Sequence, residues 1–162
     1  VKNVPYCSRP EDLRLLKGAG LAINKLNEAG FLVILVTNQS GISRNFFDKH
    51  VLRLIHDKLR KLLAEDNATI DEIFYCPHRP EENCGCRKPE LGMFAEADMK
   101  YNIQKEFSFM VGDSESDIIA GKNFGLKTIF INSNRFSSIS EKPDFVATDL
   151  LEAVNHYVLN NA

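Results

Sequence analysis

Hydrophobic positions along the chain follow two alternating patterns. Segments in which apolar residues recur every three or four positions alternate with short, continuously apolar segments rich in β-branched residues. The first pattern predicts amphipathic helices, and the second predicts strands buried on both faces of a parallel sheet. We therefore expect helices over residues 10–28, 46–64, 91–99, 114–124 and 149–158, and strands over residues 31–36, 73–75, 107–111, 128–131 and 144–147.

This alternation of strands and helices, with few hairpin signals, indicates an α/β fold with a doubly wound, Rossmann-like parallel sheet. Gly30 and Gly125 follow two of the predicted helices, where a left-handed residue commonly ends a helix. Residues 1–162 have the length of a single domain. Ligands of such sheets bind beyond the carboxyl ends of the strands, so those ends are where a site is expected.

The composition of the chain argues against two classes of binding partner. The net charge is −2, with 26% charged residues and no basic run, which argues against nucleic acid or a membrane surface as partner. No apolar stretch is long enough to span a membrane, and no signal peptide is evident. We expect a cytoplasmic monomer that acts on a small molecule.

Three cysteines and one histidine lie close together in the segment after the second predicted strand. Cys76 and His78 form C-x-H, and Cys84 and Cys86 form C-x-C, across a short loop. Three thiolates and one imidazole complete a tetrahedral zinc shell without an open position, which is typical of a structural site. A disulfide is the alternative, but a bridge between Cys84 and Cys86 would be strained, and Cys7 is remote in sequence. The pattern therefore favours zinc.

Polar residues follow three of the predicted strands. The segment Thr37–Gly41 could offer hydroxyl, amide and backbone donors to a phosphate, or could be a simple polar turn. Arg87 and Lys88, directly after the cysteine loop, could bind an anion or be solvated cations. Asp113 and Asp117 could be hard oxygen ligands for Mg²⁺, or an N-cap and a partner of the helix dipole.

Three segments together resemble one family. Val36–Ile42 (V-T-N-Q-S-G-I), Cys76–Pro89 (C-P-H…C-G-C-R-K-P) and Val111–Asp117 (V-G-D-S-E-S-D) are similar to motifs of the haloacid dehalogenase superfamily. They are most similar to its zinc-loop branch of small phosphatases, in which a short zinc-binding loop replaces a large cap. The resemblance covers the chain from about Tyr6 to its end.

The resemblance implies a role for each residue of these segments. Lys88 and Thr37 would be catalytic, with Lys88 offsetting the charge of the phosphate. Asp113 would bind Mg²⁺ and Asp117 would support that metal. The remaining expected substrate contacts are Asn38, Gln39, Ser40, Arg87 and Ser114, and the expected zinc ligands are Cys76, His78, Cys84 and Cys86. We expect Lys88 and Asp113 to lie at an exposed strand end.

One motif of the superfamily does not occur in these residues. The superfamily attacks phosphorus with an aspartate of a D-x-D-G motif at the end of its first strand, and residues 1–6 resemble the segment after that motif. We therefore expect roughly 20 further residues ahead of Val1, one strand and its loop. That strand would lie between the strands at residues 31–36 and 107–112. The alternative is a binding or regulatory protein that lacks the nucleophile.

The resemblance also suggests a substrate. It implies a Mg²⁺-dependent phosphatase that hydrolyses a small sugar phosphate through an aspartyl-phosphate, of the heptose 1,7-bisphosphate type, because the segment Lys88–Met93 is more similar to those enzymes than to histidinol-phosphate phosphatases. Histidinol phosphate remains the alternative substrate. Arg44 could reach a second phosphate or a carboxylate, or could be a surface arginine. We expect structural or surface roles for Cys7, His50, His56 and His156.

Overall fold

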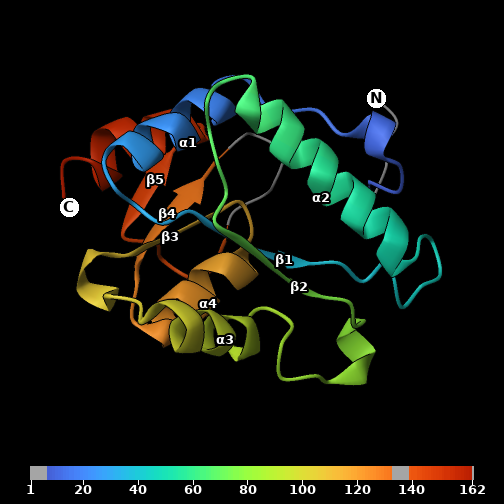
Figure 1. Ribbon diagram of the computed structural model, residues 1–162. Coiled ribbons are helices and arrows are strands. Elements are labelled where there is room, and N and C mark those ends of the chain that lie inside the picture. Colours follow the sequence, from blue (N-terminus) through green and yellow to red (C-terminus); the bar gives the residue numbers. More distant parts are fainter. Residues whose placement is uncertain (1–6, 133–138, 162) are drawn as a thin grey trace.

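Parallel strands and the helices that connect them make up the fold (Figure 1). The computed structural model describes residues 7–132 and 139–161. The strands are β1 (Ile34–Asn38), β2 (Glu72–Cys76), β3 (Phe109–Gly112), β4 (Lys127–Ile131) and β5 (Phe145–Ala147). The helices are α1 (Ala19–Glu28), α2 (Lys49–Ala64), α3 (Gly92–Tyr101), α4 (Glu115–Phe124) and α5 (Leu150–Glu152), and α5 continues as a π-helix over Ala153–Val158. Short 3₁₀ turns occupy Pro10–Asp12, Pro80–Glu82 and Lys105–Phe107.

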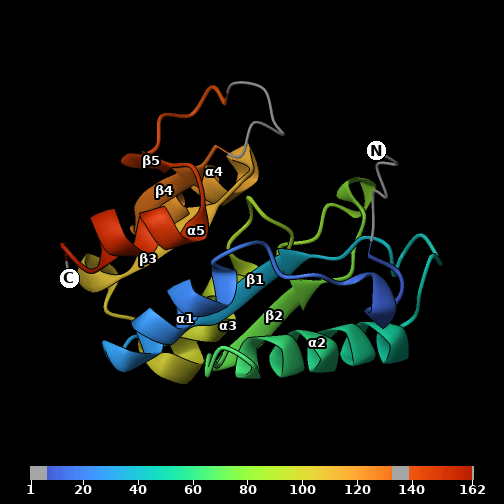
Figure 2. The same cartoon turned by 90° about the horizontal axis from the view of Figure 1, so that it is seen from above.

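All the strand pairs are parallel, which confirms the predicted α/β class. At the carboxyl end of the first pair Asn38 lies opposite Cys76, and at the end of β3 Gly112 lies opposite Phe130. The polar segments that follow β1, β2 and β3 therefore emerge on the same side of the molecule, as Figure 2 shows from above.

The strands form two sheets. β1 pairs with β2, and β4 lies between β3 and β5, but β1 and β3 share no ladder. Within residues 7–132 and 139–161, no strand pairs with the facing edges of β1 and β3. Every residue of β1 is half-buried, so this strand is less buried than its continuously apolar sequence predicts. The physical reason is that β1 has neighbouring side chains from β2 on one side only.

Helices cover both faces of the strands. α1 packs with α2 and α5 on one face, while α4 lies against β3 and β4 and α3 lies near β2 on the other (Figure 1). Three hydrophobic clusters result, built around Ile129, Leu63 and Phe94. No helix in the described part of the chain has the length and apolar character that crossing a membrane requires.

Two sequence-predicted boundaries are wrong for an identifiable reason. The helix predicted over residues 10–28 begins only at Ala19, because Gly18 adopts a left-handed conformation with φ of 78°. The strand predicted from Phe31 begins at Ile34. Gly30 is also left-handed, and the N–H of Phe31 donates to Leu26 O at 3.0 Å, so these residues end α1 instead of starting β1.

Candidate active site

The predicted zinc ligands converge at the end of β2. Their donor atoms (the Sγ atoms of Cys76, Cys84 and Cys86, and a ring nitrogen of His78) lie within 4.8 Å of one another. The Sγ of Cys76 is 3.1 Å from that of Cys86 and 3.5 Å from that of Cys84, and the Nδ1 of His78 is 3.3 Å from the Sγ of Cys86. A tetrahedron with Zn–S bonds of about 2.3 Å has S–S edges of about 3.8 Å, slightly longer than these separations, so the donor set suits one zinc ion.

The thiols do not ionise alike when they face one another without a metal. Burial and the sulfurs of Cys76 and Cys84 raise the pKa of Cys86 to about 12. Burial also opposes ionisation of Cys84, but hydrogen bonds from Cys76 and from the backbone of Cys86 and Arg87 lower its pKa to about 7. A divalent cation would favour the thiolate at every one of these positions, which again suits zinc.

The segment over residues 76–86, called the zinc loop after its predicted ligands, is joined to its surroundings by backbone hydrogen bonds. The N–H of Gly92 donates to Gly85 O at 2.8 Å, and the N–H of Ser43 donates to Pro77 O at 3.3 Å. The Nη1 of Arg87 donates to His78 O at 3.2 Å, which ties the predicted substrate-binding arginine to the loop. The loop therefore lies beside the segment that follows β1.

Lys88, which follows the zinc loop, contacts both β1 and the helix that follows β3. Its Nζ is 2.6 Å from the carbonyl oxygen of Val36 on β1 and 2.6 Å from Oδ1 of Asp117 on α4. Only 10% of the Lys88 side chain and 7% of the Asp117 side chain are exposed, so the expectation that Lys88 lies at an exposed strand end is wrong. Among the described residues, the buried Oδ1 of Asp117 has no hydrogen-bond partner besides this ammonium group, which compensates its charge.

The turn between β3 and α4 folds the Asp117 carboxylate back toward the strand. Ser114 is the N-cap of α4, and its N–H and Oγ donate to Oδ2 of Asp117 at 3.1 and 2.7 Å. A Cβ on Gly112 would lie 2.3 Å from the Cβ of Asp117, so only glycine allows this approach. Asp113 lies between these residues and is exposed at the end of β3. A carboxylate exposed at that position could bind a hard cation such as Mg²⁺.

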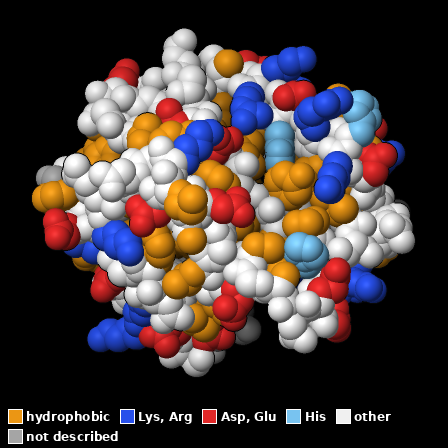
Figure 3. Space-filling view, turned by 60° about the horizontal axis from the view of Figure 1, so that its bottom comes forward, with side chains coloured by type: hydrophobic (Ala, Val, Ile, Leu, Met, Phe, Trp, Pro, Cys, Tyr) orange, Lys and Arg blue, Asp and Glu red, His pale blue; other side chains and the backbone are white. Residues whose placement is uncertain are grey.

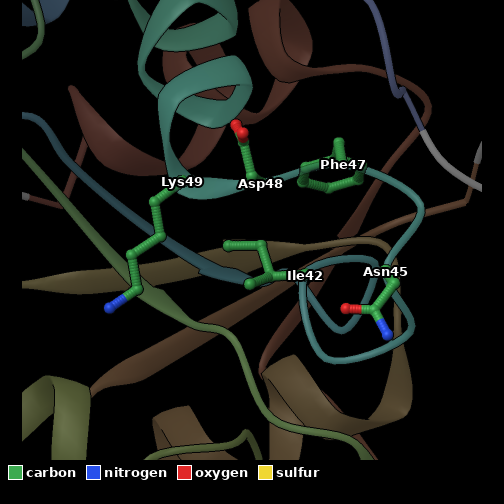
Figure 4. Close-up of a pocket in the computed structure, with 5 residues that line it drawn as sticks. All are labelled: Ile42, Asn45, Phe47, Asp48 and Lys49. Carbon is green, nitrogen blue, oxygen red and sulfur yellow. The ribbon is translucent and has the colours of Figure 1, made fainter.

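The segment after β1 forms a compact loop. The side-chain amide of Gln39 donates to the hydroxyl of Thr37 at 3.1 Å, and the N–H of Gln39 donates to Cys76 O at 2.7 Å. Ser40 is buried, and Gly41 packs directly under the ring of Phe47. A hollow of about 330 Å³ lies at the outer end of this loop, lined by Ile42, Asn45, Phe47, Asp48 and Lys49 (Figure 4).

The surrounding surface carries cations beside hydrophobic side chains. Figure 3 shows one face of the molecule. In the right half of this view, where the zinc loop and the loop after β1 lie, Lys, Arg and His side chains surround a hydrophobic area. Arg44 is exposed in the loop after β1. His50 and His156 are exposed, while His56 is half-buried against the ring of Tyr75, and Cys7 is half-buried.

The structure thus gathers most of the predicted site at one edge. Two features of that edge were not anticipated: the Lys88–Asp117 ion pair, and a pair of hydrogen bonds between the Asn38 amide and the Lys88 backbone. The predicted roles of Asn38 in binding phosphate and of Asp117 in supporting Mg²⁺ stay predictions. Neither unanticipated contact has a local sequence signal, since the partners are far apart along the chain.

Comparisons with known proteins agree with this geometry. Residues 85–153 match a family model described as HAD-hydrolase-like. The chain is 35% identical over 159 residues to D-glycero-β-D-manno-heptose-1,7-bisphosphate 7-phosphatase of Haemophilus ducreyi, covering 92% of this chain and 87% of that protein. It is 40% identical over 112 residues to a probable D-glycero-D-manno-heptose-1,7-bisphosphate 7-phosphatase of Thermoplasma volcanium, covering 69% of this chain and 77% of the relative.

A solved structure is similar over nearly the whole chain. The D,D-heptose 1,7-bisphosphate phosphatase of Bordetella bronchiseptica, crystallised with magnesium and phosphate, superposes with a TM-score of 0.89 at 32% identity. The match covers 98% of this chain and 91% of that one. With its Cys₃His cluster, its Lys88 and its strand-end aspartates, the chain belongs to the D-glycero-D-manno-heptose-1,7-bisphosphate 7-phosphatase family of HAD-like hydrolases.

Proposed function

We propose that this protein is a Mg²⁺-dependent phosphatase that removes the 7-phosphate of a D-glycero-D-manno-heptose 1,7-bisphosphate, acting as a cytoplasmic monomer. The observation that carries the proposal is the position of Lys88. A lysine held between β1 and α4, directly after a closed Cys₃His loop, supplies one fixed positive charge where three strand ends meet. The names of the relatives support the choice of sugar.

Each residue of the site has a defined task in this proposal. Lys88 offsets the negative charge that spreads over the phosphate oxygens in the transition state, and the hydroxyl of Thr37 orients one of those oxygens. Asp113 and the phosphate would hold Mg²⁺, and Asp117 would support that metal from nearby; the cation would supply further positive charge at the phosphate. Gln39, Ser40, Ser114 and Arg87 lie in the segments that follow these strands and would bind the rest of the substrate.

The nucleophile is the part that the described residues do not contain. The proposal assigns the attack to an aspartate on a strand that would lie between β1 and β3. The open, facing edges of these two strands support that placement, since unpaired buried backbone groups cost about 1–3 kcal/mol each. Attack by a carboxylate divides one difficult displacement into two steps through an acyl phosphate, which water then hydrolyses.

Zinc is proposed as a structural ion. Cys76, His78, Cys84 and Cys86 would use all of its coordination positions, so no position remains for substrate or water. Its effect would be to fix the loop whose last cysteine lies two residues before Lys88. The bound loop also borders the substrate space in place of a larger cap domain.

A substrate panel tests the proposal. Full-length protein, with Mg²⁺, is given heptose 1,7-bisphosphate, the heptose 1-phosphate and 7-phosphate monoesters, and histidinol phosphate, and phosphate release is measured. The proposal expects the bisphosphate to have the highest kcat/KM and to yield the 1-phosphate as product. Preference for histidinol phosphate would move the protein to that substrate class. Absence of turnover on every compound, with the anions still bound, would make it a non-catalytic binding protein.

A further inference from the structure

The side-chain amide of Asn38 is engaged with a single partner residue. Its Oδ1 accepts from the N–H of Lys88 at 3.0 Å, and its Nδ2 donates to the carbonyl oxygen of Lys88 at 3.2 Å. Both main-chain polar groups of Lys88 are therefore fixed by one side chain. The sequence suggests instead that this amide contacts the substrate.

We propose that Asn38 is a positioning residue for Lys88 and does not itself contact the transferring phosphate; the inference rests on the proposed role of Lys88 in phosphoryl transfer. Asn38 is the last residue of β1 and lies opposite the zinc ligand Cys76 on β2. Lys88 returns to this point after the loop closed by Cys86. The amide thus joins the end of the zinc loop to the end of a strand.

The remaining contacts of Lys88 show what this connection achieves. Its Nζ reaches Val36 O, two residues before Asn38 on the same strand, so main chain and ammonium group are both held against β1. Lysine is a long side chain that can adopt many rotamers when it is not held in place. Fixing the backbone of Lys88 restricts the positions that its ammonium group can reach. A displacement of a catalytic group by about 1 Å can slow a reaction by about 100-fold.

The competing role is a direct contact between Asn38 and phosphate. One N–H of the Asn38 amide remains after the two bonds to Lys88, so this role predicts its own outcome. If Asn38 acts through Lys88, its loss has no further effect once the lysine charge is gone. If Asn38 touches phosphate, the effects of the two substitutions multiply.

A double-mutant cycle on the full-length protein distinguishes the two roles. Asn38→Ala, Lys88→Met and the double variant are compared with wild type for kcat and KM on heptose 1,7-bisphosphate. We expect Asn38→Ala to lower kcat by about 10- to 100-fold with KM little changed. In the Lys88→Met background the same change should alter kcat by less than about twofold. Equal effects of Asn38→Ala in both backgrounds, or an effect below twofold in wild type, would overturn the proposal.

The chain provides a matched control for the structural effect of losing such an amide. Asn27 on α1 makes the same reciprocal pair with Thr69, accepting from its N–H at 2.8 Å and donating to its carbonyl at 3.2 Å. Asn27→Ala should lower the melting temperature without changing kcat. If Asn38→Ala does not fold, Asn38→Asp keeps the acceptor for the Lys88 N–H and replaces it in the cycle.

A second readout separates this inference from the proposed function. The same four proteins are titrated with orthovanadate, and its Kd is measured. If the wild type does not hydrolyse the bisphosphate, the proposed function fails, and the vanadate cycle alone decides the role of Asn38. If Asn38→Ala raises the Kd of vanadate in wild type but not in the Lys88→Met variant, the positioning role is supported. If it raises the Kd equally in both backgrounds, that role is contradicted.

Discussion

Lys88 shows how a single residue depends on contacts that lie far away in sequence. Its charge is buried, and the carboxylate that compensates it belongs to α4, while its backbone is held by β1. Removing one partner of a buried ion pair typically costs about 3–5 kcal/mol, so Asp117 stabilises the fold as well as the site. The glycine at position 112 provides the space that lets the Asp117 carboxylate approach the strand end.

Two glycines, Gly85 in the zinc loop and Gly92 at the start of α3, allow a test at the residue scale. A Cβ on Gly92 would lie 2.6 Å from Gly85 O and 2.9 Å from Cys86 Cα, whereas a Cβ on Gly85 would meet nothing within 4 Å. We expect wild type to hold one zinc per chain, and Gly92→Ala to weaken zinc binding by about 10- to 100-fold because it displaces Cys86. Gly85→Ala should stay within about twofold of wild type.

Elemental analysis and competition with a chromogenic chelator measure both quantities. Wild-type protein without zinc, or equal zinc affinities for the two alanine variants, would contradict the proposed zinc site.

At the scale of elements, helix termini and turns decide where the sequence-based expectations are correct. The helix predicted over residues 114–124 is confirmed, because its signals are local: Ser114 caps its start and Gly125 follows its end. The start of β1 could not be predicted from hydrophobicity, since Phe31 is as apolar as a strand residue but closes the preceding helix. The convergence of the three cysteines and His78 was predictable from their spacing alone, whereas the contacts of Asn38 and Lys88 depend on the sheet register.

The start of α2 provides a prediction about stability. The carboxylate of Asp48 accepts from the N–H of Val51 at 2.8 Å and so satisfies one of the unpaired donors in the first turn. We expect Asp48→Ala to lower the free energy of unfolding by about 1 kcal/mol. Thermal denaturation followed by circular dichroism should show a melting temperature lower by about 2–4 °C.

Asp57 on the same helix is the control, since it is exposed and lies away from the helix terminus. Asp57→Ala should change stability by less than about 0.5 kcal/mol. If the two alanine variants melted together below wild type, loss of surface charge would explain the effect and the cap would not.

At the scale of the whole molecule, the parallel sheets bring distant polar segments to one edge. The zinc loop, the loop after β1 and the turn before α4 follow different strands, yet they meet because the carboxyl ends of these strands lie on the same side (Figure 2). The facing edges of β1 and β3, which pair with no strand in the described part of the chain, lead to this meeting point. The proposed nucleophile would complete the site from that position.

The central claim is that Lys88 and a cation held by Asp113 act together on one phosphate. The direct measurement is the turnover of heptose 1,7-bisphosphate by full-length wild type, Lys88→Met and Asp113→Asn, followed by ³¹P NMR so that the released phosphate is identified. Zinc content and circular dichroism establish that each variant is folded. We predict release of the 7-phosphate and a loss of roughly 100- to 1,000-fold in kcat for each variant. If both folded variants kept turnover within a few-fold of wild type, Lys88 and Asp113 would have no part in the chemistry, and the account would be contradicted.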